Sequence, residues 1–153
     1  MLSPVISAAF PALATDDPVV THPPDPRFNC VAWAAGTVDA VWWPADPDGY
    51  WPAGVPDERT VAAMVAALGT VGSVSCAGGE PEPGFEKVAV YARSDVPTHV
   101  ARQSADGRWS SKLGRDCVVG HATPGGVEGA VYGSVVAYLR RPTRTTDGGR
   151  VGE

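Results

Sequence analysis

Cys30 and His99 are the residues of this 153-residue chain whose types and positions best suit covalent chemistry. Cys30 follows Asn29, a good helix N-cap, in a short run that Gly36 can close, so the pattern predicts a helix that begins at the thiol. A helix N-terminus favours the thiolate, and a nearby imidazolium favours it further. His99 falls inside a predicted strand, on the face that it shares with the small Ala101. The pair predicts a cysteine nucleophile with a histidine base, and an ordinary buried thiol is the alternative interpretation.

The turn that follows His99 decides which residues of the next strand share its face. The S-A-D-G segment at 104–107 predicts a hairpin, because Asp-Gly supplies the positive φ that such turns require. A four-residue loop would place Lys112 opposite His99 with Ser110 diagonal to it, whereas a three-residue loop with a glycine bulge would place Ser111 on that face. Both registers stay open at this point, so Ser110, Ser111 and Lys112 are all candidates to face His99.

Substrate contacts are expected from residues around this pair. A proline-rich loop at 38–56 holds four aromatic residues, Trp42, Trp43, Tyr50 and Trp51, which would form an aromatic wall beside the Cys30 helix or anchor the loop on the core. Glu86 opens the predicted strand that precedes the strand of His99, and its carboxylate is solvated or points toward the His99 imidazole. The candidate substrate-binding residues are Asn29, Trp33, Trp42, Trp43, Glu86 and Lys112.

The order of elements predicts the fold class. Apolar residues with helical spacing come first, and from Glu86 onward the spacing changes to the period of a strand. Helices followed by antiparallel strands indicate an α+β fold. The predicted elements are helices over 28–36 and 57–68 and strands over 86–92, 98–103, 108–113 and 134–140.

The ends of the chain differ from its middle. Residues 1–26 hold six prolines and are expected to form a flexible, extended arm, and 142–153 a disordered tail, around a single domain over 27–141. The first 14 residues are expected to be a disordered leader instead of a secretion signal, because no basic residue precedes their apolar part. His121 is expected at the surface and Cys76 and Cys117 in the core.

Composition excludes several classes of function. The net charge is −5 and basic residues are scattered, so no nucleic-acid partner is expected. No apolar run approaches the length of about 18 residues that spans a bilayer, so no membrane partner is expected. Three separated cysteines and three separated histidines indicate neither a disulfide framework nor a metal site, and no cofactor is expected.

Two segments resemble known cysteine hydrolases. F-N-C-V-A-W-A is similar to the nucleophile helix of the papain-like superfamily, particularly the NlpC/P60 and CHAP amidases, and T-H-V-A-R-Q-S-A-D-G-R-W is similar to the histidine hairpin of transglutaminase-like folds. The resemblance implies a papain-like domain, with helices packed on a small antiparallel sheet. It also implies Cys30 as nucleophile, His99 as base, and Ser110, Ser111 or Lys112 as the third catalytic residue, of which we expect Ser111.

The same region also resembles a small bacterial family without an assigned activity, through segments such as F-N-C-x-A-W-A-A-G and T-H-x-A-R-Q. Together the resemblances imply a cytoplasmic, thiol-dependent hydrolase or acyl or amide transferase. Its substrate would be an amide or thioester of a peptide or small molecule. The alternative is a non-catalytic binding module of the same fold that uses the Trp- and Pro-rich loop.

Overall fold

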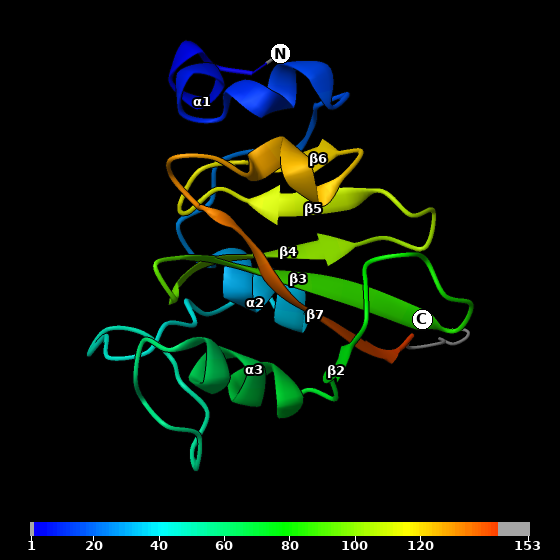
Figure 1. Cartoon of the computed structure of the whole chain (residues 1–153). Coiled ribbons are helices and arrows are strands. Elements are labelled where there is room, and N and C mark those ends of the chain that lie inside the picture. Colours follow the sequence, from blue (N-terminus) through cyan, green and yellow to red (C-terminus); the bar gives the residue numbers. More distant parts are fainter. Residues whose placement is uncertain (1, 144–153) are drawn as a thin grey trace.

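The computed structural model describes residues 2–143, and it confirms the α+β class. Seven strands form one antiparallel sheet in the order β1-β6-β5-β4-β3-β7-β2, with helices around it (Figure 1). The strands are β1 (Val19–His22), β2 (Val74–Cys76), β3 (Phe85–Arg93), β4 (Val96–Gln103), β5 (Trp109–Lys112), β6 (Val118–His121) and β7 (Ser134–Pro142). The helices are α1 (Pro4–Ala9), α2 (Cys30–Ala35) and α3 (Val61–Gly69), with 3₁₀ turns η1 (Pro11–Thr15) and η2 (Pro124–Val127).

The two faces of the sheet carry two separate cores. Side chains alternate along a strand, so Val90 and Val100 lie on one face while Tyr91 and Ala101 lie on the other. The first face packs against α2 and α3. The second is covered by α1, η1 and η2. The face on which a strand residue lies therefore decides which helices it can contact.

The helix that begins at Cys30 forms as its local sequence predicts. The Asn29 side chain caps α2 by accepting a hydrogen bond from the Ala32 amide at 3.2 Å, and Gly36 closes the helix in the left-handed conformation at φ 91°. The helix predicted over 57–68 begins later, at Val61, because the Thr60 hydroxyl supplies its cap.

The prediction of a flexible arm over 1–26 is wrong for most of that segment. The prolines do not prevent helices there, because Pro4 and Pro11 each open a helical element, where a missing N–H costs nothing. Ile6, Phe10 and Leu13 are buried against the second face of the sheet. Further along, β1 pairs with β6 at the sheet edge.

The sheet extends further than the sequence pattern suggested. Strands β1, β2 and β6 join the four predicted strands. At the other end, β7 continues to Pro142, and the Thr143 amide donates to the Gly84 carbonyl at 2.9 Å. The remainder of the predicted disordered tail, 144–153, lies outside the described residues.

The hairpin between β4 and β5 settles the register after His99. Arg102 pairs with Ser110 and Gln103 with Trp109. The Ser104 amide donates a hydrogen bond to the Arg108 carbonyl at 2.8 Å. Three residues remain in the loop, and Gly107 takes the left-handed conformation at φ 90°. The structure therefore has the three-residue loop with a glycine bulge, the second of the two predicted registers.

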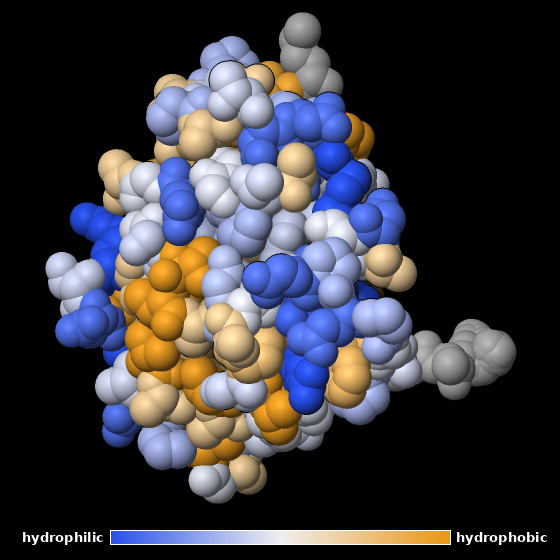
Figure 2. Space-filling model, turned by 45° about the vertical axis from the view of Figure 1, so that its right-hand side comes forward, coloured by the Kyte–Doolittle hydropathy of each residue, from blue (hydrophilic) through white to orange (hydrophobic). Residues whose placement is uncertain are grey.

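The surface is mixed in polarity. In Figure 2 hydrophilic residues cover most of the upper part of the visible face, and hydrophobic residues gather in the lower part, at the height of α3 and β7. Among the exposed apolar side chains, Val74 of β2 and Val136 of β7 are at least half exposed, at 59% and 50%. Among residues 2–143, no helix combines the length and apolar character that crossing a membrane requires.

Candidate functional site

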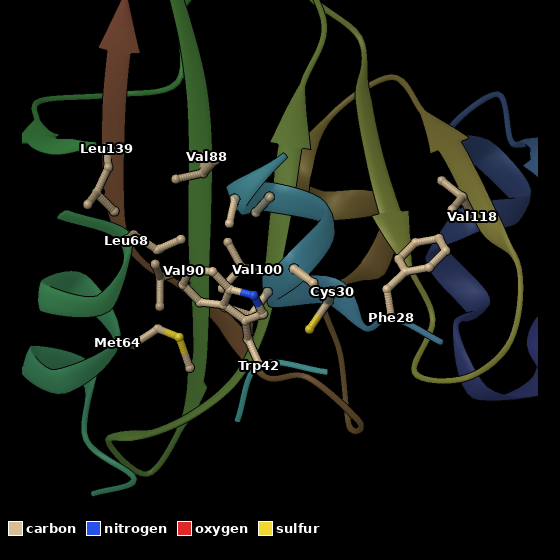
Figure 3. Close-up of a cluster of buried hydrophobic side chains, with 14 residues drawn as sticks. Phe28, Cys30, Trp42, Met64, Leu68, Val88, Val90, Val100, Val118 and Leu139 are labelled. Carbon is tan, nitrogen blue, oxygen red and sulfur yellow. The ribbon is translucent and has the colours of Figure 1, made fainter. Parts of the chain in front are cut away.

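Cys30 stands at the first turn of α2 but is part of the core. Only 6% of the residue is exposed, and it packs in the cluster formed by α2, α3 and the first face of the sheet. Figure 3 shows Cys30 within this cluster, with its thiol beside Trp42. A substrate carbonyl cannot contact the sulfur while these side chains remain in place.

The electrostatics of Cys30 follow from this burial. Burial removes water from around the Cys30 thiol and raises its pKa to about 11, against an ordinary value of 9.0. Backbone amides of Val100 in β4 and of Val31 and Cys30 in α2, together with the nearby Lys112, lower the pKa of the thiol, but burial outweighs them. The thiol is therefore protonated at neutral pH and is a poor nucleophile.

The predicted pairing of Cys30 with His99 is not formed in the structure. His99 follows the alternation of β4 to the second face, where its ring stacks on Tyr132 with centroids 4.0 Å apart and planes 3° apart. It also contacts the Tyr91 ring, at 5.2 Å. The neighbouring Val100 is the β4 residue that packs with Cys30. The sheet therefore separates the thiol from the imidazole.

His99 does contact Ser111, the residue that we expected to complete the catalytic set. Its Nε2 lies 2.9 Å from Ser111 Oγ, and the same oxygen lies 2.9 Å from His121 Nε2. His121 Nδ1 is 2.6 Å from the Thr123 carbonyl and 3.8 Å from an Asp16 carboxylate oxygen. The expectation of a surface position for His121 is wrong, because β6 carries it inside with no exposed area.

The partners determine where the protons of this network lie. The Thr123 carbonyl only accepts hydrogen bonds, so His121 Nδ1 carries a proton. Burial lowers the pKa of both His99 and His121, so both rings are neutral and His121 Nε2 accepts from the Ser111 hydroxyl. Ser111 Oγ in turn accepts from His99 Nε2. His99 Nδ1 is then an unprotonated nitrogen, and it is the buried side-chain nitrogen among residues 2–143 without a hydrogen-bond partner.

These neutral histidines predict a stability that falls in acid. In the unfolded chain each imidazole binds a proton below about pH 6.5, whereas in the folded protein the lowered pKa delays protonation. The free energy of unfolding is therefore highest above pH 6.5 and falls as the pH drops, by up to about 1.4 kcal/mol per pH unit for each histidine. Urea denaturation between pH 7.5 and pH 5 measures this slope.

His22 supplies the control for the pH measurement. His22→Gln removes an exposed imidazole from β1 and is the matched control, while His99→Gln removes a buried one and should reduce the slope. A wild-type slope that stays near zero down to pH 5, or one that only the His22 variant changes, would contradict the neutral buried pair.

Other predicted residues meet in a pocket of about 560 Å³ on the α2 side of the sheet. Trp33 of α2 and Glu86 of β3, both predicted to bind substrate, line this Trp33 pocket together with residues that the prediction did not include. The Trp33 indole donates to Ser110 Oγ at 2.9 Å, which ties α2 to β5. The other principal lining residues are Thr21, His22, Arg102 and Arg141.

Ion pairs arrange the floor of the Trp33 pocket. Arg141 donates from Nε and Nη2 to one Glu86 oxygen at 3.1 and 2.8 Å, and from Nη1 to the Ala35 carbonyl at 3.0 Å. Arg102 Nε lies 3.9 Å from the same Glu86 oxygen. Its guanidinium carbon lies 5.1 Å from the centroid of the Trp33 ring, a cation–π contact. Charged groups from β3, β4 and β7 thus converge on one pocket, in which Arg102 contacts the indole.

The remaining predicted contact residues have structural roles. Asn29 holds the loop after α2 by donating to the Trp42 carbonyl at 2.7 Å and accepting from the Trp42 amide at 3.0 Å. Trp42 is buried and Trp43 half-buried on the first core, so they anchor the loop. Lys112 is buried, with Nζ donating to the Asp25 and Gly114 carbonyls at 2.6 and 2.7 Å. These four residues are not placed to line the Trp33 pocket.

Sequence reasoning missed Arg102 and Arg141, although one signal pointed to Arg102. Along β4 the bulkier apolar residue, Val100, marks the face that a helix would cover, and Arg102 follows it at the strand period of 2. Arg141 has no comparable local signal. Its place depends on the pairing of β7 with β3, which sets Glu86 opposite Arg141.

Comparison with protein families gives one match. Residues 19–140 match the model of a Domain of unknown function (DUF7689), which covers well over half of the chain. The chain belongs to the DUF7689 family. No curated protein and no solved structure matches it. The DUF7689 match begins at β1, so it includes Trp33, Glu86 and Arg102 but excludes α1, η1 and Asp16.

Proposed function

We propose that this DUF7689 domain is a binding module for a small polar ligand, which it holds in the Trp33 pocket. The observation that carries the proposal is the convergence of a half-buried indole, a carboxylate and two guanidiniums on one pocket of about 560 Å³. Ligand sites typically combine this volume with a few polar groups that fix orientation. The Trp33 pocket is a different surface from the Trp- and Pro-rich loop, which we expected to bind the ligand of a non-catalytic module.

Thiol-dependent hydrolysis or acyl transfer stays a prediction, as do the papain-like fold and the cytoplasmic location. Their support is the likeness of the F-N-C-V-A-W-A and T-H-V-A-R-Q segments to cysteine hydrolases. The geometry favours binding over this chemistry, since Cys30 is buried and His99 lies on the other face of the sheet. For the thiol to act, the first core would have to open.

Fragment screening by nuclear magnetic resonance tests the binding proposal. The chain has five tryptophans, each with one indole N–H signal, and Trp33→Phe identifies the signal of Trp33. We expect small polar fragments to shift that signal and the amide signals of Thr21 and Arg102. The same shifts should appear in Cys30→Ala, because the thiol does not line the pocket.

Two results would contradict this function. In one, no fragment shifts the Trp33 indole at millimolar concentration, or the shifts map to Trp42 and Tyr50 on the proline-rich loop. In the other, the protein hydrolyses an amide or thioester substrate and Cys30→Ala abolishes the reaction. The second result would establish the thiol chemistry instead.

A further inference from the structure

We infer that the Trp33 pocket recognises its ligand through an N–H donor, of the kind that a primary carboxamide carries, and that Glu86 accepts this hydrogen bond. The inference rests on the proposed binding function and adds the chemical class of the ligand. It goes beyond that function because a polar pocket of the same volume could equally hold a ligand that only accepts hydrogen bonds.

The two oxygens of the Glu86 carboxylate differ in their partners. Arg141 donates from Nε and Nη2 to Oε1 at 3.1 and 2.8 Å, and Arg102 Nε lies 3.9 Å from the same oxygen. Oε2 accepts no hydrogen bond from residues 2–143. The buried side-chain atom of that range without a partner is His99 Nδ1, so Oε2 keeps accessible surface. Glu86 lines the Trp33 pocket and therefore offers it a carboxylate oxygen.

The Glu86 carboxylate is held in place before a ligand arrives. The register of β3 and β7 sets Glu86 opposite Arg141, so the sheet itself brings the ion pair together. The Arg141 side chain is only 5% exposed, and its Nη1 donates to the Ala35 carbonyl at 3.0 Å. An acceptor that is already fixed loses little entropy when a donor binds. Because Arg141 balances the charge of Glu86, a neutral N–H donor suffices as its partner.

The burial of Glu86 makes its free oxygen selective. The side chain is 15% exposed, so a ligand in the pocket removes much of the water that still reaches Oε2. A ligand with an N–H group replaces that water by a charge-assisted hydrogen bond. A ligand without a donor leaves an ionised acceptor buried and unpaired, which costs its full desolvation. The difference between the two ligands is therefore large.

Neutral groups complete the lining of the Trp33 pocket. Thr21, Ser104 and Thr143 bring hydroxyl groups to it, and Ala105 and Trp33 bring apolar surface. A hydroxyl can donate to the carbonyl oxygen of an amide while a carboxylate accepts from the amide nitrogen. The apolar surface suits the carbon part of the ligand. A primary carboxamide on a small ring or chain fits this combination, because one planar group carries both the donor and the acceptor.

Two neutral compounds of the same shape test the inference. Benzamide carries an NH₂ group, and acetophenone has a methyl group in its place. Titrations of each into the full chain, followed at the Trp33 indole signal, give two dissociation constants. We expect acetophenone to bind at least about tenfold more weakly, the scale of a lost hydrogen bond to a charged group. Acetophenone is the less polar compound, so unspecific apolar binding would give the opposite order.

Variants of Glu86 assign the effect to its carboxylate. Glu86→Gln leaves one oxygen for Arg141 and puts an NH₂ group in place of the free oxygen. It should weaken benzamide about tenfold or more and leave acetophenone unchanged. Glu86→Asp keeps the charge opposite the buried Arg141 and withdraws the free oxygen by one methylene, so it should also weaken benzamide. Melting temperatures show whether each variant is folded.

Glu82→Gln is the matched control for these variants. Glu82 is also a carboxylate that pairs with an arginine, Arg140, but it does not line the Trp33 pocket. The substitution removes the same charge as Glu86→Gln does. Both affinities should therefore stay at the values of the wild type.

The outcomes separate this inference from the proposed function. If acetophenone binds as tightly as benzamide, or a folded Glu86→Gln binds benzamide as the wild type does, the inference is wrong and the binding function stands. If Glu82→Gln weakens benzamide as much as Glu86→Gln does, the effect is general charge and the inference is wrong. If neither Glu86 variant folds, the ratio of the two compounds in the wild type decides. If neither compound shifts the Trp33 indole while other polar fragments do, the inference again fails alone. If no compound of any class shifts it, both proposals fail.

Discussion

Iodoacetamide at pH 7.5 is expected to leave Cys30 of the native protein essentially unmodified while it alkylates Cys76. The thiol pKa of about 11 reduces the thiolate fraction about 100-fold relative to a thiol of pKa 9.0. Burial adds to this, because the reagent reaches the sulfur only when the core opens. We expect Cys30 to react at least about 1000-fold more slowly than a small free thiol. Peptide mass spectrometry of timed samples measures each cysteine separately.

Internal controls accompany the alkylation experiment. Cys117 is buried, with 3% exposed, and should be protected like Cys30, whereas Cys76 is half-buried on β2. In denaturant all three should react alike. His99→Ala should not slow the alkylation of Cys30, because the sheet lies between the two side chains. Fast alkylation of native Cys30 that His99→Ala slows would contradict this account and support the cysteine hydrolase.

The substitution Gly133→Ala is expected to cost about 4 kcal/mol or more of unfolding free energy, or to prevent folding. Gly133 has a φ of 76°, and a Cβ there would overlap the Ala92 carbonyl oxygen and lie 2.8 Å from the Ala92 carbonyl carbon. These are backbone atoms of β3, which cannot move aside as a flexible side chain does. The displaced chain would also carry Tyr132 away from its stack on His99. Urea denaturation measures the loss.

Gly72→Ala separates the steric overlap from the backbone strain. Gly72 has a φ of 96°, and a Cβ there would meet no atom within 4 Å. It should therefore cost only the strain of a left-handed alanine, about 1–2 kcal/mol. Equal losses in the two variants would show that the contact with Ala92 relaxes without cost, and our account of Gly133 would be wrong.

The parts of the fold that depend on a few neighbouring residues were predictable. The cap at Asn29 and the glycine that ends α2 are local signals, because each acts through backbone groups within four or five positions. The hairpin at 104–107 is local as well, since Asp-Gly defines the turn. The sequence did not choose between its two registers, and the structure supplied the three-residue loop that places Ser111 beside His99.

The face of the sheet on which α2 packs was not predictable in the same way. A small residue next to His99, Ala101, suggested room for the helix on that face. In the structure the helix packs on the opposite face, in the cluster that contains Val88, Val90 and Val100. Period-2 alternation places neighbours on opposite faces, so this single choice separated His99 from Cys30 and brought Arg102 beside Trp33.

By itself the sequence determined the α+β class, four strands, the α2 helix and a hairpin, because these follow from spacing, capping and turn chemistry. Tertiary structure decided which polar groups meet. The Trp33 pocket joins Thr21 of β1 to Arg141 of β7, and the buried network joins Asp16 to His121. Such contacts depend on the order of the strands in the sheet and on which apolar faces are buried. Both are set by the whole chain, and no short stretch of residues encodes them.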